Sequence, residues 1–77
     1  MSSEQFHLTF PDGAERERTV AMLRTSFPVH LNIRRANVES DASWYIVELT
    51  GEDDEIEGAV AWLLDQGVHV DRIPTDG

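Results

Sequence analysis

Several short runs of this chain alternate between apolar and polar residues, which is the period of a β-strand with one buried face. The clearest run is Phe6-His7-Leu8-Thr9-Phe10, after which Pro11 ends the pattern. Trp44-Tyr45-Ile46-Val47-Glu48-Leu49-Thr50 is rich in aromatic and β-branched residues, which favour strands. Val68-His69-Val70-Asp71 alternates again near the end of the chain. These runs predict strands over about residues 5–10, 44–50 and 68–73.

A longer strand over about residues 29–39 changes its pattern halfway. Apolar residues alternate over 29–33 and again over 36–38, but the second group is out of phase with the first. A bulge near Arg34 and Arg35 would return both groups to one face, because a bulge adds one residue to one strand of a pair. The alternative is a plain change of partner along the strand. Since bulges often redirect side chains near functional sites, this segment is the first candidate for a site.

Two intervening segments have the apolar spacing of amphipathic helices. Asp12-Gly13-Ala14-Glu15 matches a capping box, which predicts a helix from there to about Ser26, before Pro28. Residues 52–55 are all acidic and complement the positive end of a second helix, which Gly67 is placed to stop in a left-handed conformation. The predicted order is therefore strand, helix, strand, strand, helix, strand.

This order predicts a four-stranded antiparallel sheet with both helices on one face, built by two right-handed strand–helix–strand crossovers. The α+β arrangement is the ferredoxin-like βαββαβ sandwich, a name that refers to shape and implies no iron–sulfur cluster. We expect residues 1–77 to form one domain with an ordered core over about 5–73. The expected buried core is Phe6, Leu8, Phe10, Val20, Leu23, Leu31, Ile33, Tyr45, Val47, Leu49, Ile56, Val60, Leu63, Val68 and Val70.

Composition narrows the possible functions. The 77 residues carry 15 acidic and 6 basic side chains, for a net charge of −9, and every basic residue is Arg. Nucleic-acid binding depends on neutralising phosphates, so this acidity argues against a nucleic-acid partner and against an anionic membrane surface. The absence of Cys excludes disulfides and Cys-ligated metal. A domain this small buries only about 60% of its unfolded surface, so oligomerisation is a natural source of stability.

Targeting signals are missing from the sequence. No apolar segment approaches the roughly 18 residues that cross a bilayer, so we expect no membrane insertion. The first residues have neither the basic flank nor the apolar centre of a signal peptide. We therefore expect a cytoplasmic protein.

The sheet face turned away from the helices is expected to be open and to include two large apolar side chains, Trp44 and Ile46. An apolar patch surrounded by polar groups suggests a partner surface, so we expect a homodimer through this face, with Trp44 and Ile46 at the contact, or through its edge strand. The alternative is that Trp44 merely lies over the strand edge. The residues expected on this face are His7, Thr9, His30, Asn32, Arg34, Trp44, Ile46, Glu48, His69 and Asp71.

Catalysis is not expected. Ser43 and Asp71 are candidates for a triad with one of the three His, but nothing in their spacing places a nucleophile beside its base. No glycine-rich phosphate loop is present. The acidic run 52–55 lacks the spaced oxygen ligands and the glycine of a calcium loop, so we expect neither a metal nor a cofactor.

Taken in order, four segments resemble the NIL domain, which is named for an Asn-Ile-Leu run. They are Phe6-His7-Leu8-Thr9-Phe10, Val29-His30-Leu31-Asn32-Ile33, Tyr45-Ile46-Val47-Glu48-Leu49-Thr50-Gly51 and Leu64-Asp65-Gln66-Gly67-Val68-His69-Val70. The resemblance spans about residues 5–73 and implies a ferredoxin-like fold, similar in shape to small ACT-like amino-acid-sensing domains. The family occurs on the ATPase subunit of bacterial methionine importers, where it pairs with its twin and binds methionine at the interface. It also occurs beside iron–sulfur ferredoxin modules tied to sulfur amino-acid metabolism.

The resemblance implies that Asn32 contacts a ligand, because Asn32 matches the Asn of the family's run. The run's third letter is Leu, but this chain has Arg34, followed by Arg35. An Arg pair can hold a carboxylate through bidentate bonds, whereas the bland alternative is charge balance on an acidic surface. Ala36 and Val38 are candidates for contacts with an apolar ligand side chain.

Two function classes remain open from the sequence. The first is a small-molecule sensor that binds methionine or a related amino acid between two subunits. The second is a protein-interaction module that docks on a separate transporter or sulfur-metabolism enzyme.

Overall fold

The computed structural model describes residues 1–11, 16–38 and 43–74 and confirms the predicted order of elements. The elements are β1 (Ser2–Phe10), α1 (Arg16–Ser26), β2 (His30–Val38), β3 (Ser43–Gly51), α2 (Asp53–Asp65) and β4 (His69–Ile73). They form the α+β, ferredoxin-like sandwich that the pattern indicates. The predicted capping box over 12–15 lies outside the described residues.

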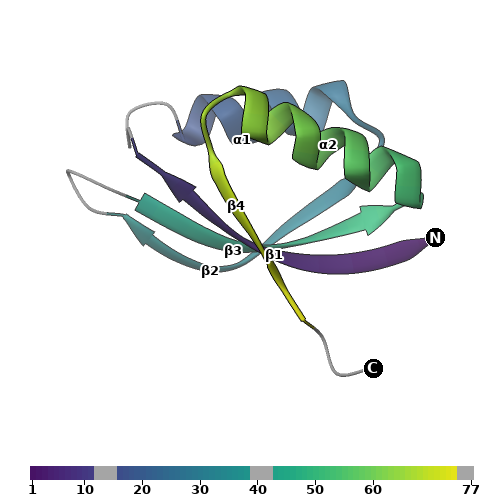
Figure 1. Ribbon diagram of the computed structural model, residues 1–77, viewed down its shortest axis with the longest axis horizontal. Helices are drawn as coiled ribbons and strands as arrows, with labels where there is room; N and C mark the ends of the chain where they lie inside the picture. Colours follow the sequence, from purple (N-terminus) through teal and green to yellow (C-terminus); the bar gives the residue numbers. More distant parts are fainter. Residues whose placement is uncertain (12–15, 39–42, 75–77) are drawn as a thin grey trace.

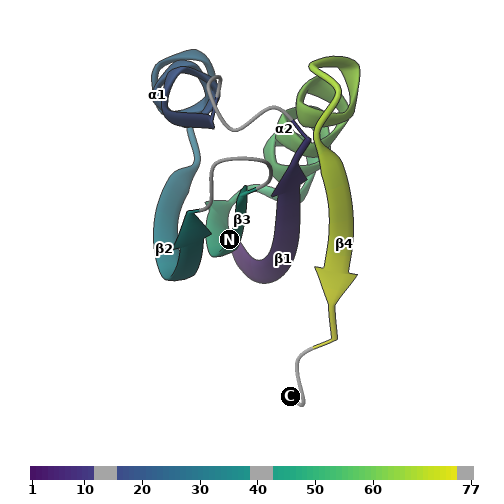
Figure 2. The same ribbon diagram turned by 90° about the vertical axis from the view of Figure 1, so that its left-hand side faces the viewer.

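All four strands join one antiparallel sheet in the order β2-β3-β1-β4. Both helices cover the same face of this sheet, and the other face carries no helix (Figure 1). Seen from the side, α1 stands over the β2 half and α2 over the β4 half (Figure 2). The crossovers thus leave β1 and β3 in the centre and β2 and β4 at the edges.

The predicted bulge is confirmed in β2. Ile33 pairs with Val47 and Arg35 pairs with Ile46, so that Arg34 is the extra residue between two aligned stretches. The extra residue reverses the alternation beyond it. As a result, Ala36 and Val38 after the bulge lie on the same face of the sheet as Leu31 and Ile33 before it, as the apolar pattern predicts.

The helix side of the sheet holds the buried core. The residues that are both predicted and buried are Phe6, Leu8, Phe10, Val20, Leu23, Leu31, Tyr45, Val47, Leu49, Ile56, Leu63 and Val68. Val29 and Ala59 are also buried, whereas Val60 and Val70 are only partly covered. Ile33 was predicted to be buried, but 38% of it is exposed. It lies on the helix side of the sheet as the alternation predicts, but β2 is an edge strand with a neighbour on one side only.

Local chemistry explains where the second helix ends. Gly67 has a φ of +86°, which is the left-handed conformation expected of a stop glycine. The amide of Val68 then donates to the carbonyl of Leu63 at 3.1 Å, which satisfies one of the free carbonyls of the last turn. The chain reverses there and enters β4.

Candidate functional site

The open face of the sheet consists of alternate residues from all four strands. Strand pairing aligns them in rows across the sheet: Asn32 lies opposite Glu48, Arg35 opposite Ile46, and Asn37 opposite Trp44. On the other side of β3, His7 lies opposite Ile46 and Thr9 opposite Trp44. We call this surface the open face, made up of Gln5, His7, Thr9, His30, Asn32, Arg35, Asn37, Trp44, Ile46, Glu48, His69 and Asp71.

A polar group forms where Asn32 faces Glu48. The bulged residue Arg34 reaches the same carboxylate, with 3.9 Å between its Nη1 atom and Glu48 Oε1. The Glu48 side chain is 29% exposed, compared with 51% for Arg34, so the carboxylate is the more sheltered partner. Arg34 thus reaches the Glu48 carboxylate from the bulge, and Asn32 lies opposite Glu48 in the strand pairing. The role of Glu48 in this group was not anticipated from the sequence.

The bulge divides the predicted ligand-contacting residues between two faces. Asn32 precedes the bulge and Arg35 follows it, and both are exposed on the open face. Ala36 pairs with Tyr45 and Val38 pairs with Ser43, so these two share the phase of the helix-side residues. They are exposed at the edge of the sheet but point away from Asn32.

Trp44 and Ile46 are half-buried on the open face. The indole of Trp44 is stacked on the imidazole of His7, with ring centroids 5.2 Å apart and planes inclined by 28°. His7 Nδ1 lies 3.4 Å from the hydroxyl of Thr9, the residue opposite Trp44. The indole thus lies across the neighbouring strand β1, and aromatic and aliphatic groups remain together at the centre of the face.

Only part of the candidate triad comes together: Asp71 lies opposite His7 in the pairing of β1 with β4, but Ser43 does not join them. Ser43 is buried on the helix side of β3, whereas His7, His69 and Asp71 lie on the open face. Within the described residues, no group of three or more His, Asp or Glu is arranged to hold a metal ion. Among these residues there is also no helix of the length and apolarity needed to cross a membrane.

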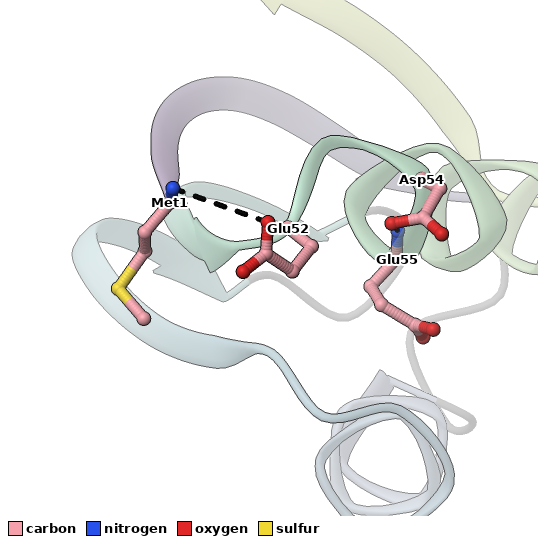
Figure 3. Close-up of polar contacts among 4 residues, drawn as sticks. All are labelled: Met1, Glu52, Asp54 and Glu55. Atoms are coloured by element: carbon pink, nitrogen blue, oxygen red, sulfur yellow. Dashed lines mark hydrogen bonds and ion pairs between the residues drawn. The ribbon is translucent and has the colours of Figure 1, made fainter.

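The acidic run lies at the start of α2, with Glu52 as the N-cap and the other three residues in the first turn, as the helix dipole favours. The α-amino group of Met1 lies 4.0 Å from Glu52 Oε2, and the backbone N–H of Glu55 donates to Asp54 Oδ1 at 3.0 Å (Figure 3). The carboxylates of Glu52 and Asp54 thus make local contacts with the chain itself.

A groove on the helix side was not predicted. It has a volume of about 760 Å³ and lies between α2, the first half of β1 and β4. Its apolar lining comes from Phe6, Ile56, Val60, Ala61, Leu64 and Val70, and its polar rim from Ser2, Ser3, Glu4, Asp53, Glu57 and Arg72. One sequence feature relates to it: Asp53 and Glu57 are spaced to share one side of a helix. The predicted first and fourth strands, about 5–10 and 68–73, gave no sign that β1 extends beyond β4.

Comparison with known proteins shows the family of this chain. A search of curated proteins found no match. The family model described as the NIL domain matches residues 4–72 of this chain. That match includes every strand of the sheet and both helices, apart from the outermost residues of β1 and β4. The chain therefore belongs to the NIL domain family.

Proposed function

We propose that this protein is a regulatory domain that binds methionine or a related amino acid on its open face, at the boundary between two copies of the chain. NIL domains are non-catalytic regulatory domains, and membership in that family makes a small ligand-binding domain the coarse assignment. The observation that carries the finer proposal is the ion pair of Arg34 with Glu48, which lies opposite Asn32 and on the same face as the half-buried Ile46.

The chemistry of that group suits a zwitterion. A free amino acid presents a carboxylate and an ammonium group, and the amide of Asn32 offers both a donor and an acceptor. Arg34 and Arg35 supply donors for the carboxylate, and Arg side chains bind carboxylates with two parallel hydrogen bonds. Trp44 and Ile46 provide the apolar surface that most of a small-ligand site requires.

A second copy of the chain completes the proposed site. On an isolated sheet face a small ligand keeps one side in water, whereas ligand sites are concave and bury most of the ligand. A partner that covers Trp44 and Ile46 would supply the missing wall. The same contact would add buried apolar area to a small domain.

Isothermal titration with a panel of amino acids tests this function. The parent is expected to release or absorb heat on adding methionine or a close relative. Asn32→Ala should weaken that binding by about 1–3 kcal/mol, because the ligand's polar atoms would be buried without a partner. Gln66→Ala is the matched control, since it removes an exposed amide at the far end of α2.

The results separate the two function classes. Equal affinity of the parent and Asn32→Ala, measured at equal dimer content, would remove Asn32 from the site. No heat with any amino acid would contradict the sensing function. It would instead favour docking on a separate transporter or sulfur-metabolism enzyme, for which the groove beside α2 supplies a candidate surface.

A further inference from the structure

The groove beside α2 ends at a strand edge that is only partly paired. β1 pairs with β3 along Ser2–Phe10, but it pairs with β4 only over Gln5–Thr9. In the part of the chain that the structure describes, no strand therefore lies on the β4 side of Ser2–Glu4. A strand directs backbone N–H and C=O groups to both of its sides, so this edge offers hydrogen-bonding groups to an added strand.

Among the described residues, β4 stops short of this edge. Ile73 is the last residue of β4 and pairs with Gln5, and Pro74, which has no N–H to donate, follows directly. In Figure 1 the yellow strand β4 turns away toward the C-terminus, whereas the purple strand β1 continues toward the N-terminus beside the first turns of α2. Residues of both segments, Ser2, Ser3 and Asp53 among them, line the same groove.

The base of the groove is apolar, and its rim carries acidic side chains. Phe6 and Ile56 are buried at its base, while Leu64 is 55% exposed along its side. Arg72 forms an ion pair with Glu4, so the cation of the rim is already matched by a carboxylate. The remaining rim carboxylates, Asp53 and Glu57, lie four residues apart on one side of α2, where like charges repel each other.

We propose that this groove is a docking site for an extended peptide segment of a partner protein, in which apolar residues alternate with Lys or Arg. The segment would add as a strand beside Ser2–Glu4. Because side chains alternate along a strand, every second residue would enter the apolar groove. Basic residues of the segment would meet Asp53 and Glu57. The proposal is independent of amino-acid binding on the open face.

An extended peptide fits these features better than a small molecule does. The groove is open to solvent on one side, and one wall is a strand edge whose backbone groups an added strand can match in register. Binding by strand addition draws affinity from backbone hydrogen bonds and specificity from pockets for alternate side chains. The partly paired edge at Ser2–Glu4 and the apolar lining of the groove lie together at this one site.

The test is a ¹H–¹⁵N NMR titration with a five-residue peptide of alternating lysine and valine, blocked at both ends and added at millimolar concentration. The expected result is a shift of the amide signals of Ser2–Glu4 and of the first two turns of α2. The shifts should weaken as salt is added, because exposed charge pairs are screened. The same peptide with glutamate in place of lysine should leave these signals unchanged.

Charge variants make the test specific. The double variant Asp53→Asn with Glu57→Gln should weaken binding of the lysine peptide about fivefold, as expected for the loss of two exposed charge pairs. The matched control is Asp54→Asn with Asp65→Asn, which makes the same change in net charge on α2 outside the groove lining. The control variant should bind like the parent.

Several outcomes would overturn the docking site. These are an absence of shifts at the groove, equal binding of the glutamate peptide, or shifts confined to the open face. Shifts produced equally by free lysine would indicate a small-molecule site instead. Groove signals that move with protein concentration alone would indicate a second copy of the chain as the occupant.

Discussion

The backbone of Gly51 packs directly against the side chain of Val29, so a Cβ atom at Gly51 would lie 3.0 Å from Val29 Cγ1. The carbonyl oxygen of Pro28 would be only 3.3 Å away. This close approach joins the end of β3 to the segment that leads from α1 into β2. It explains a glycine at the position where the strand run ends.

We therefore expect Gly51→Ala to destabilise the fold by about 1–3 kcal/mol through overpacking. Gly58→Ala is the matched control, because a Cβ there would meet Phe27 Cε1 at 3.6 Å, which is ordinary contact. That variant should gain about 0.5–1 kcal/mol, since Ala is favoured over Gly inside a helix. Urea denaturation of both variants measures the difference, and equal stabilities would contradict the packing at Gly51.

Leu23→Ala should reduce the free energy of unfolding by about 2–5 kcal/mol, because Leu23 is fully buried and its loss leaves a cavity. In a domain of this size such a loss is a large part of the total stability. The neighbouring Met22 is 41% exposed, so Met22→Ala should change stability little. If thermal melting of Leu23→Ala comes within about 2 °C of the parent, Leu23 is not in the core.

The stacked pair of His7 and Trp44 gives a prediction for the open face. Aromatic pairs contribute about 0.5–1.5 kcal/mol beyond their buried area, so His7→Ala should lower stability by about that amount. It should also change the fluorescence of Trp44, whose ring loses its cover. His69→Ala, at an exposed position on the edge strand, is the control and should leave both measurements near the parent values.

The proposed dimer contact is tested at Ile46. We expect the parent to sediment as a dimer at high micromolar concentration and Ile46→Asp to sediment as a monomer, since burying an unpaired charge at the contact is strongly unfavourable. Met22→Asp places the same charge on the helix side of the molecule and should leave the dimer intact. A monomeric parent at that concentration would remove the open-face dimer.

Element order is the property that the residue pattern determines by itself. Alternation at Phe6–Phe10, apolar spacing in the helices and the stop at Gly67 are all local features, and each corresponds to the observed element. The phase change after Arg35 predicted the bulge for the same reason, because a strand with one dry side cannot change parity without an extra residue.

Tertiary structure decided what lies beside each element. Ile33 has the phase of a core residue, but its exposure follows from the edge position of β2, which depends on the order of strands far apart in sequence. The separation of Asn32 from Ala36 and Val38, and the meeting of Glu48 with Arg34, follow from the register of two paired strands.

The groove beside α2 has the same kind of origin. It exists because β4 pairs with only part of β1. How far one strand extends beyond the other is decided by the register in which the two strands pair. Local periodicity indicates which side of a helix or strand is buried. Burial and proximity depend on partners that long-range pairing brings in, and those partners decide which polar side chains meet.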